Sequence, residues 1–431
     1  MSQTQPDRLQ RELGIGGATM MGLGSMVGTG VFISIGIAAG AAGPAVILAI
    51  ILAAGVATCN ALSSAQLAAS HAVSGGTYEY GYRYLSPTLG FTAGWMFLCA
   101  KSASAATAAL GFAGYFLRLM GGSLDYMAWV AVAAVALFTM LVLGGIRRSS
   151  WVNMVIVSIT LLTLGSFIVW GAPIAVAEGE NNLVPFFTSR EGNLLEPFLY
   201  ATALMFVAFT GYGRIATLGE EVKNPRRTIP RAIIVTLIVT ALLYVAVAAV
   251  AISSVGADRF ANAPGARATP LELAARAMDA PLLARLVAVG AITAMLGVLL
   301  NLILGLSRVL LAMGRQGDVP PFFGRLSKED ASPAAAVIAV GVLVATLASL
   351  GSIETAWAFS AFTVLVYYAI TNLAALRLPE KERLYPRWVA LTGLAACLFL
   401  AFWVPVSIWI TGLCVIGIGL LWKRFLPPLW R

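Results

Sequence analysis

Two glycine-rich stretches lie within long apolar segments: GLGSMVGTGVF at residues 22–32 and FVAFTGYGR at residues 206–214. Glycine inside a helix costs about 1 kcal/mol relative to alanine, so each cluster indicates either close packing of membrane helices or an unwound stretch. Unwinding frees backbone N–H and C=O groups, which a membrane tolerates only where they line a cavity or bind something. The positive end of the half-helix that follows the break suits a carboxylate.

Lys101 is the only lysine or acidic residue deep within an apolar segment. A charge at the centre of a bilayer costs about 2.5–3.5 kcal/mol on insertion scales, and such residues usually face a cavity. We expect Lys101 to be the proton carrier or a sensor of substrate charge. The alternative is a lysine that pairs with carbonyl groups and only stabilises packing.

The sequence contains few residues that could bind a metal, form disulfides or act in catalysis. His71 is the only histidine, and the four cysteines lie inside apolar runs without a CxxC spacing. We therefore expect no metal site, no cofactor and no disulfide framework. The apolar segments also offer no paired carboxylates and no nucleophile beside a histidine, so an enzyme is the class we expect least.

The composition of the chain defines the elements that must hold these residues. Of 431 residues, 59% are hydrophobic and 11% are charged, and the mean hydropathy is +0.88. Soluble domains carry about 25% charged residues, so a soluble globular protein and a disordered chain are both excluded. The net charge of +9 sits in short loops, which indicates a lipid bilayer and no nucleic acid as the surroundings.

The apolar runs are continuous, which favours membrane helices over the alternating pattern of membrane strands. The first run is too long for one helix of about 20 residues and divides at Gly43-Pro44. The second glycine-rich stretch lies five segments after the first, which is typical of a transporter with inverted repeats. We predict twelve membrane helices, at 14–39, 43–68, 87–119, 126–144, 152–176, 197–219, 228–254, 282–313, 334–351, 354–377, 387–404 and 406–425.

Most of the 28 lysines and arginines lie in segments on the same side of the membrane as the N-terminus. By the positive-inside rule this predicts a multi-pass protein of the cell membrane with both termini in the cytoplasm. Two longer connections, 177–196 and 255–281, then lie outside. Each is either an ordinary surface loop or a segment with short helices that cap an outer vestibule.

Four motifs together resemble the amino acid permeases of the amino acid–polyamine–organocation superfamily. They are GSMVGTGVF from residue 24, SGGTYEYGYRYL from residue 74, FTGYGRIATLGEEVKNPRRTIPRAI from residue 209 and GVLLNLILGLSRVLLAMGRQGDVP from residue 297. The resemblance covers essentially the whole chain. It implies secondary active transport of an amino acid by alternating access.

The resemblance also implies an all-α, leucine-transporter-like fold: five plus five helices as inverted repeats, with helices 1 and 6 broken, and two extra helices. The expected parts are a cytoplasmic tail at 1–13, the first repeat at 14–176, an outer loop at 177–196, the second repeat at 197–377, helices 11 and 12 at 387–425 and a C-terminal tail at 426–431.

By position, the resemblance assigns substrate binding to both glycine-rich stretches. Backbone N–H groups of the first would bind the carboxylate, and carbonyl groups near Met26 and in the second would bind the ammonium. Phe206 and Phe209 are candidates for a lid or side-chain pocket, or else they pack in the core or face lipid. The expected substrate-binding residues are Ser25, Met26, Val27, Gly28, Thr29, Gly30, Phe206, Ala208, Phe209, Thr210 and Gly211.

The sequence departs from the family pattern in the fifth segment, where many members carry a lysine at the place of a sodium ion. Thr160 stands there instead, and Thr293 is the only hydroxyl residue between Val287 and Asn301. These two threonines make at most a partial ion site. We therefore favour coupling to protons, or exchange without an ion, over sodium.

Arg214, Glu220 and Glu221 follow the second stretch. They form either part of an inner gate or ordinary charged groups at a helix end.

Neither stretch contains an acidic residue, and Lys101 would repel extra positive charge. Neutral amino acids are therefore preferred as substrates, with acidic ones second. The alternatives are a polyamine or cationic amino acid exchanger of the same fold and a non-transporting amino acid sensor. Symport, antiport and the choice between monomer and homodimer remain open.

Overall fold

The computed structural model describes residues 13–71, 75–144, 150–187, 193–216, 222–262, 268–326 and 333–425. The elements within these ranges are helices joined by turns and loops, and Leu13 and Val222 form an isolated β-bridge. The expectation of an all-α membrane protein is confirmed at this level.

The first 56 residues of helical structure form one apolar stretch, Ile15–Ser70. Its parts are α1 (Ile15–Met26), the π-helical turn η1 (Gly30–Ser34), α2 (Ile35–Ala42), the 3₁₀ turn η2 (Gly43–Ala45) and α3 (Val46–Ser70). Gly43 has a φ of 60°, a conformation that favours glycine, and Pro44 follows it. This pair divides the stretch where the sequence predicts a division.

The remaining helices continue the bundle. In order they are α4 (Thr77–Tyr84), α5 (Pro87–Leu119), η3 (Leu124–Tyr126), α6 (Met127–Leu143), α7 (Ser150–Asn182), α8 (Leu195–Phe209), η4 (Thr210–Tyr212), α9 (Gly213–Ala216), α10 (Pro225–Val255), α11 (Ala257–Asn262), α12 (Pro270–Ala277), α13 (Pro281–Arg315), η5 (Pro321–Gly324), α14 (Ala334–Ser349), α15 (Ile353–Leu376), η6 (Glu380–Glu382), α16 (Arg387–Ala401) and α17 (Val406–Phe425).

Two of these elements bear on the long connections. Helix α7 continues to Asn182, so the expected loop at 177–196 is helical at its start. The reason is packing along α10, where the Asn182 side-chain amide donates to the Ser253 carbonyl at 2.8 Å. The short helices α11 and α12 lie in the described part of 255–281, so this segment contains short helices, as one of the two alternatives expected.

By length and composition, nine helices of the described residues are able to cross a membrane, and α14 and α16 are shorter apolar helices. Burial separates them into central and peripheral ones. In the 18-residue apolar stretch of each helix, 83% of the residues are buried in α5 and 78% in α15, but only 11% are buried in α17. Large apolar side chains are exposed on these peripheral helices, for example Leu137 of α6, Val342 of α14 and Leu421 of α17, as expected for faces that contact lipid.

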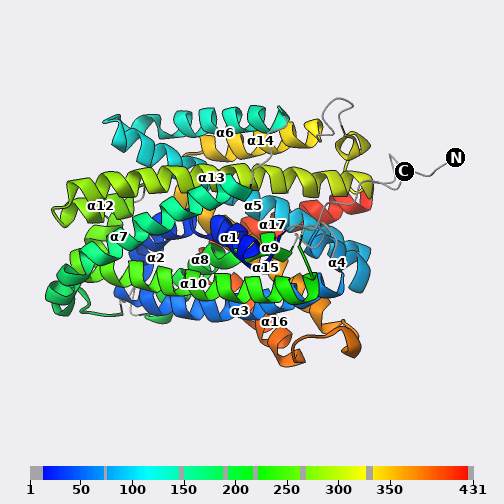
Figure 1. Ribbon diagram of the computed structural model, residues 1–431. Coiled ribbons are helices and arrows are strands. Elements are labelled where there is room, and N and C mark those ends of the chain that lie inside the picture. The colour runs from blue at the N-terminus through cyan, green and yellow to red at the C-terminus, as the bar shows by residue number, and fades with distance from the viewer. Residues whose placement is uncertain are drawn as a thin grey trace.

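Figure 1 shows α1 near the middle of the bundle, with α6 and α14 together at one edge and α16 at the opposite edge. Helices α4 and α12 lie at opposite ends of the bundle, and we refer to these as the α4 end and the α12 end. A buried ion pair fixes the α4 end. The Asp318 carboxylate, after α13, binds the Lys423 ammonium of α17 and accepts hydrogen bonds from Tyr78 and Tyr82 of α4 at 2.8 and 2.6 Å.

Candidate functional site

The first glycine-rich stretch interrupts its helix at Val27-Gly28. Helix α1 ends at Met26, Val27 leaves the helical region with a ψ of 86°, and the chain resumes as the π-helical turn η1. Helical hydrogen bonding begins again at the Gly28 carbonyl, which accepts from the backbone N–H groups of Val31 and Phe32, both at 3.1 Å. The first N–H groups of a helical segment have no partner within it, so this point provides donors for an anionic group.

The second stretch tightens instead of opening. Helix α8 ends at Phe209, residues Thr210–Tyr212 form a 3₁₀ turn, and α9 follows directly. A 3₁₀ turn within a helix often marks a functional hinge. The expected open loop is therefore a change of helical pitch at this position, which frees fewer backbone groups than full unwinding does.

The two interruptions touch each other, and their glycines allow it. A Cβ atom on Gly211 would lie 2.5 Å from the Ser25 carbonyl oxygen, and one on Gly30 would lie 2.8 Å from the Ala208 Cβ. Neither glycine has a positive φ, so close approach is what requires them. Close packing and helix interruption, the two explanations that the sequence left open, thus both apply.

A cavity of about 480 Å³ begins between the interruptions and continues to the α4 end. This volume is within the range typical of small-molecule sites. Of the expected substrate residues, the cavity is lined by Ser25, Met26, Thr29, Gly30, Ala208, Thr210 and Gly211. At the α4 end its lining includes Gly75, Gly76, Glu79, Arg308, Arg315 and Gln316.

Lys101 lies in this cavity with its side chain almost fully buried. Its ammonium donates to the Thr210 hydroxyl at 2.8 Å, and that hydroxyl donates to the Val207 carbonyl at 2.7 Å. The Tyr368 hydroxyl donates to the Thr210 carbonyl at 3.2 Å. The charged group of α5 is therefore attached to the 3₁₀ turn of the second interruption.

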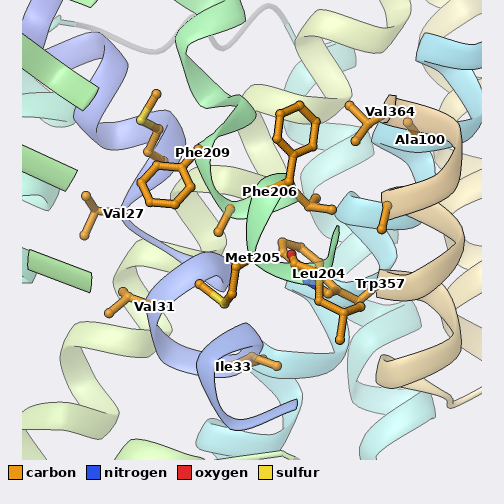
Figure 2. Packing of buried hydrophobic residues seen from close by; sticks show 14 of the residues in the cluster. Val27, Val31, Ile33, Ala100, Leu204, Met205, Phe206, Phe209, Trp357 and Val364 are labelled. Carbon is orange, nitrogen blue, oxygen red and sulfur yellow. Dashed lines mark hydrogen bonds between the residues drawn. The ribbon is translucent and has the colours of Figure 1, made fainter. Parts of the chain in front are cut away.

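Phe206 and Phe209 lie outside the lining and pack in the core. Both are fully buried. Figure 2 shows Phe206 on the side of Val364 and Ala100, and Phe209 on the side of Val27. Val27 and Gly28 also lie outside the lining, and a Cβ on Gly28 would lie 2.6 Å from the Val298 side chain.

The remaining expected residues are dispersed. The hydroxyls of Thr160 and Thr293 each donate within their own helix, to the carbonyls of Ile156 at 2.8 Å and Val289 at 3.0 Å. Arg214 lines the cavity. Glu220 and Glu221 lie outside the described residues.

Sequence reasoning missed several aromatic residues of the site. Trp357 and Tyr368 of α15 line the cavity, and the Trp357 indole donates to the Leu204 carbonyl at 3.0 Å. The Tyr244 hydroxyl of α10 donates to the Met26 carbonyl at 2.7 Å. The available signal is the residue type, because a tyrosine or tryptophan buried in a span needs a hydrogen-bond partner.

The fold and the site define a helical membrane protein with a central small-molecule cavity. The sequence matches the amino acid permease family over residues 17–428, and the chain belongs to that family. An uncharacterized transporter of Mycobacterium tuberculosis is 41% identical over 414 residues, which cover 96% of this chain and 91% of that protein.

Several relatives carry substrate names, among them two that name amino acids of different charge. A branched-chain amino acid permease of Bacillus subtilis is 28% identical, with 94% of this chain and 89% of that protein covered. The human cationic amino acid transporter 4 is 29% identical, with 88% of this chain and 62% of that protein covered. These relatives support amino acid transport and differ in the charge of the substrate that they name.

Proposed function

We propose that this permease is a proton-coupled secondary transporter of neutral amino acids that works by alternating access. The observation that carries the proposal is the cavity between two touching helix interruptions, with the Lys101 ammonium attached to one of them. The architecture that goes with it is the twelve-helix arrangement of inverted repeats, 14–176 and 197–377, with helices 11 and 12 at 387–425.

The ligand binds across the first interruption. Its carboxylate meets the N–H groups that follow Val27, and the Thr29 hydroxyl is available to it. That hydroxyl is buried, lines the cavity and has no hydrogen-bond partner among the described residues. The ammonium meets carbonyl oxygens of the helix ends, each of which accepts two hydrogen bonds.

The charges and the apolar wall of the cavity favour a neutral substrate. Glu79 is the only acidic residue in the lining that the structure describes, and it lies at the α4 end, whereas Lys101 lies beside the interruptions. A second positive charge on the substrate would be repelled there. Val207, Val298, Leu302 and Trp357 provide an apolar surface for a side chain such as that of leucine.

The cavity reaches the α4 end, where arginines cluster. In this proposal the chain spans the cell membrane with both termini in the cytoplasm, and the cavity opens toward the cytoplasm, in keeping with the positive-inside rule. The Lys101 contact supports proton coupling. A protonated Lys101 makes a charge-assisted hydrogen bond to Thr210 that holds the second interruption, and loss of the proton leaves only the weaker bond of a neutral amine. The change in this contact links protonation to movement of α8 and α9.

The test uses purified protein in liposomes, labelled leucine and an imposed proton gradient. Wild-type protein accumulates leucine when the proton gradient is imposed. The Lys101→Met variant binds leucine and exchanges it across the membrane, but it does not accumulate leucine in response to the gradient. Full pH-driven accumulation by that variant would refute the assigned role of Lys101.

The same vesicles separate the alternatives. Arginine or putrescine that displaces labelled leucine more strongly than leucine itself would favour the polyamine or cationic amino acid exchanger. Binding without any uptake or exchange would favour a sensor.

A further inference from the structure

Tyr244 connects the two helix interruptions from a third helix. This residue of α10 is fully buried. Its hydroxyl lies 2.7 Å from the Met26 carbonyl oxygen, at the end of α1, and 3.3 Å from the Ala208 carbonyl oxygen, near the end of α8. One hydroxyl proton therefore serves two carbonyl groups from opposite halves of the chain.

Close packing fixes the position of this hydroxyl. A Cβ on Gly30 would lie 2.5 Å from the Tyr244 oxygen, so the backbone of the first interruption passes directly beside it. The ring packs against Phe209 with centroids 5.2 Å apart. Thr240, one turn earlier on α10, places its hydroxyl 3.4 Å from the Met26 sulfur, so the same face of α10 contacts α1 twice.

Two carbonyl oxygens that meet at helix ends inside a membrane protein create a negative site, and transporters with interrupted helices commonly fill such a site with Na⁺. Here a neutral O–H group supplies the positive end of a dipole at that point. A buried carbonyl group without a hydrogen-bond donor destabilises the protein. Removal of the Tyr244 hydroxyl therefore leaves two unsatisfied carbonyl oxygens that a small cation could bind.

We infer that Tyr244 is a positioning residue that replaces a monovalent cation between the two interruptions, so that amino acid binding needs no sodium. The inference rests on the proposed function, because it concerns the same amino acid site. It assigns no contact between Tyr244 and the substrate. The residue acts by holding the ends of α1 and α8 at a fixed separation.

The experiment compares Tyr244→Phe with a matched control, Tyr115→Phe. Tyr115 is also fully buried, and its hydroxyl donates to a single backbone carbonyl, that of Phe32, at 2.9 Å. Tyr115→Phe removes one hydroxyl–carbonyl bond, whereas Tyr244→Phe removes the two contacts that span the interruptions. Equilibrium binding of labelled leucine is measured in detergent with choline chloride or sodium chloride at equal ionic strength, together with the melting temperature.

We expect wild-type affinity to be the same in both salts. In choline, Tyr244→Phe binds leucine about tenfold more weakly, a change that corresponds to about 1.4 kcal/mol, and sodium restores most of the loss. Tyr115→Phe stays within about twofold of wild type and does not respond to sodium.

Equal affinities for the two variants would overturn the inference. So would a weakened Tyr244→Phe variant that sodium does not restore, or wild-type binding that requires sodium. Failure of the wild-type protein to bind leucine in either salt, by contrast, would count against the proposed function.

Discussion

The contact between Gly211 and the backbone of Ser25 gives the sharpest test of the site. In Gly211→Ala the new methyl group would lie 2.5 Å from the Ser25 carbonyl oxygen, 2.6 Å from its carbonyl carbon and 2.7 Å from the Met26 Cγ. Ordinary contacts for such a group begin at 3.4 Å. The two interruptions must therefore separate by roughly 1 Å, because two of the three neighbours are backbone atoms that no rotamer change can move.

The expected magnitude follows from that displacement. Overpacking costs about 1–3 kcal/mol, and here the cost falls on the arrangement in which the two interruptions touch. We expect leucine binding to weaken by roughly 5- to 150-fold. The assay is equilibrium binding of labelled leucine to purified protein, with the melting temperature measured on the same samples.

Gly305→Ala is the matched control. Gly305 also lines the cavity, but a Cβ there meets nothing within 4 Å. We expect this variant to bind leucine as wild type does and to be slightly more stable, since alanine favours the helix by up to about 1 kcal/mol. If Gly211→Ala binds leucine as well as Gly305→Ala does, the close contact between Gly211 and Ser25 is not needed for the leucine site.

Two further predictions concern the α4 end. Lys423→Met leaves the fully buried Asp318 carboxylate without its cation; because Tyr78 and Tyr82 still donate to it, we expect a loss near the lower end of the about 3–5 kcal/mol measured for broken buried pairs. Thermal unfolding checks this, and an unchanged midpoint would contradict it.

Burial raises the pKa of Glu79 above its ordinary value of 4.5, so its contribution to stability is greatest below pH 4.5 and is lost as the pH rises through the higher pKa of the folded protein. Glu79→Gln should remove that part of the pH dependence in melting curves between pH 4 and 8, and superimposable wild-type and variant profiles would show that the carboxyl does not cause it.

The amino acid sequence is sufficient to predict an all-helical membrane protein and its family. Long apolar runs with few charges are able to cross a membrane, and the division at Gly43-Pro44 follows from local conformational preferences. The isolation of Lys101 in an apolar segment similarly predicts a residue that faces a cavity, and the cavity does contain it. These properties depend on composition and spacing over short distances, which is why they can be read directly.

The tertiary structure decided how the site is built. Phe206 and Phe209 carry the same local signal as lining residues, yet the rotation of α8 directs them into the core (Figure 2). Tyr244 reaches Met26 across 218 positions of the chain, and no local pattern indicates that pairing. Whether a glycine cluster opens a helix, as after Met26, or only tightens it, as at Thr210, depends on the side chains that neighbouring helices bring to the freed backbone groups. Those partners are set by packing between distant segments.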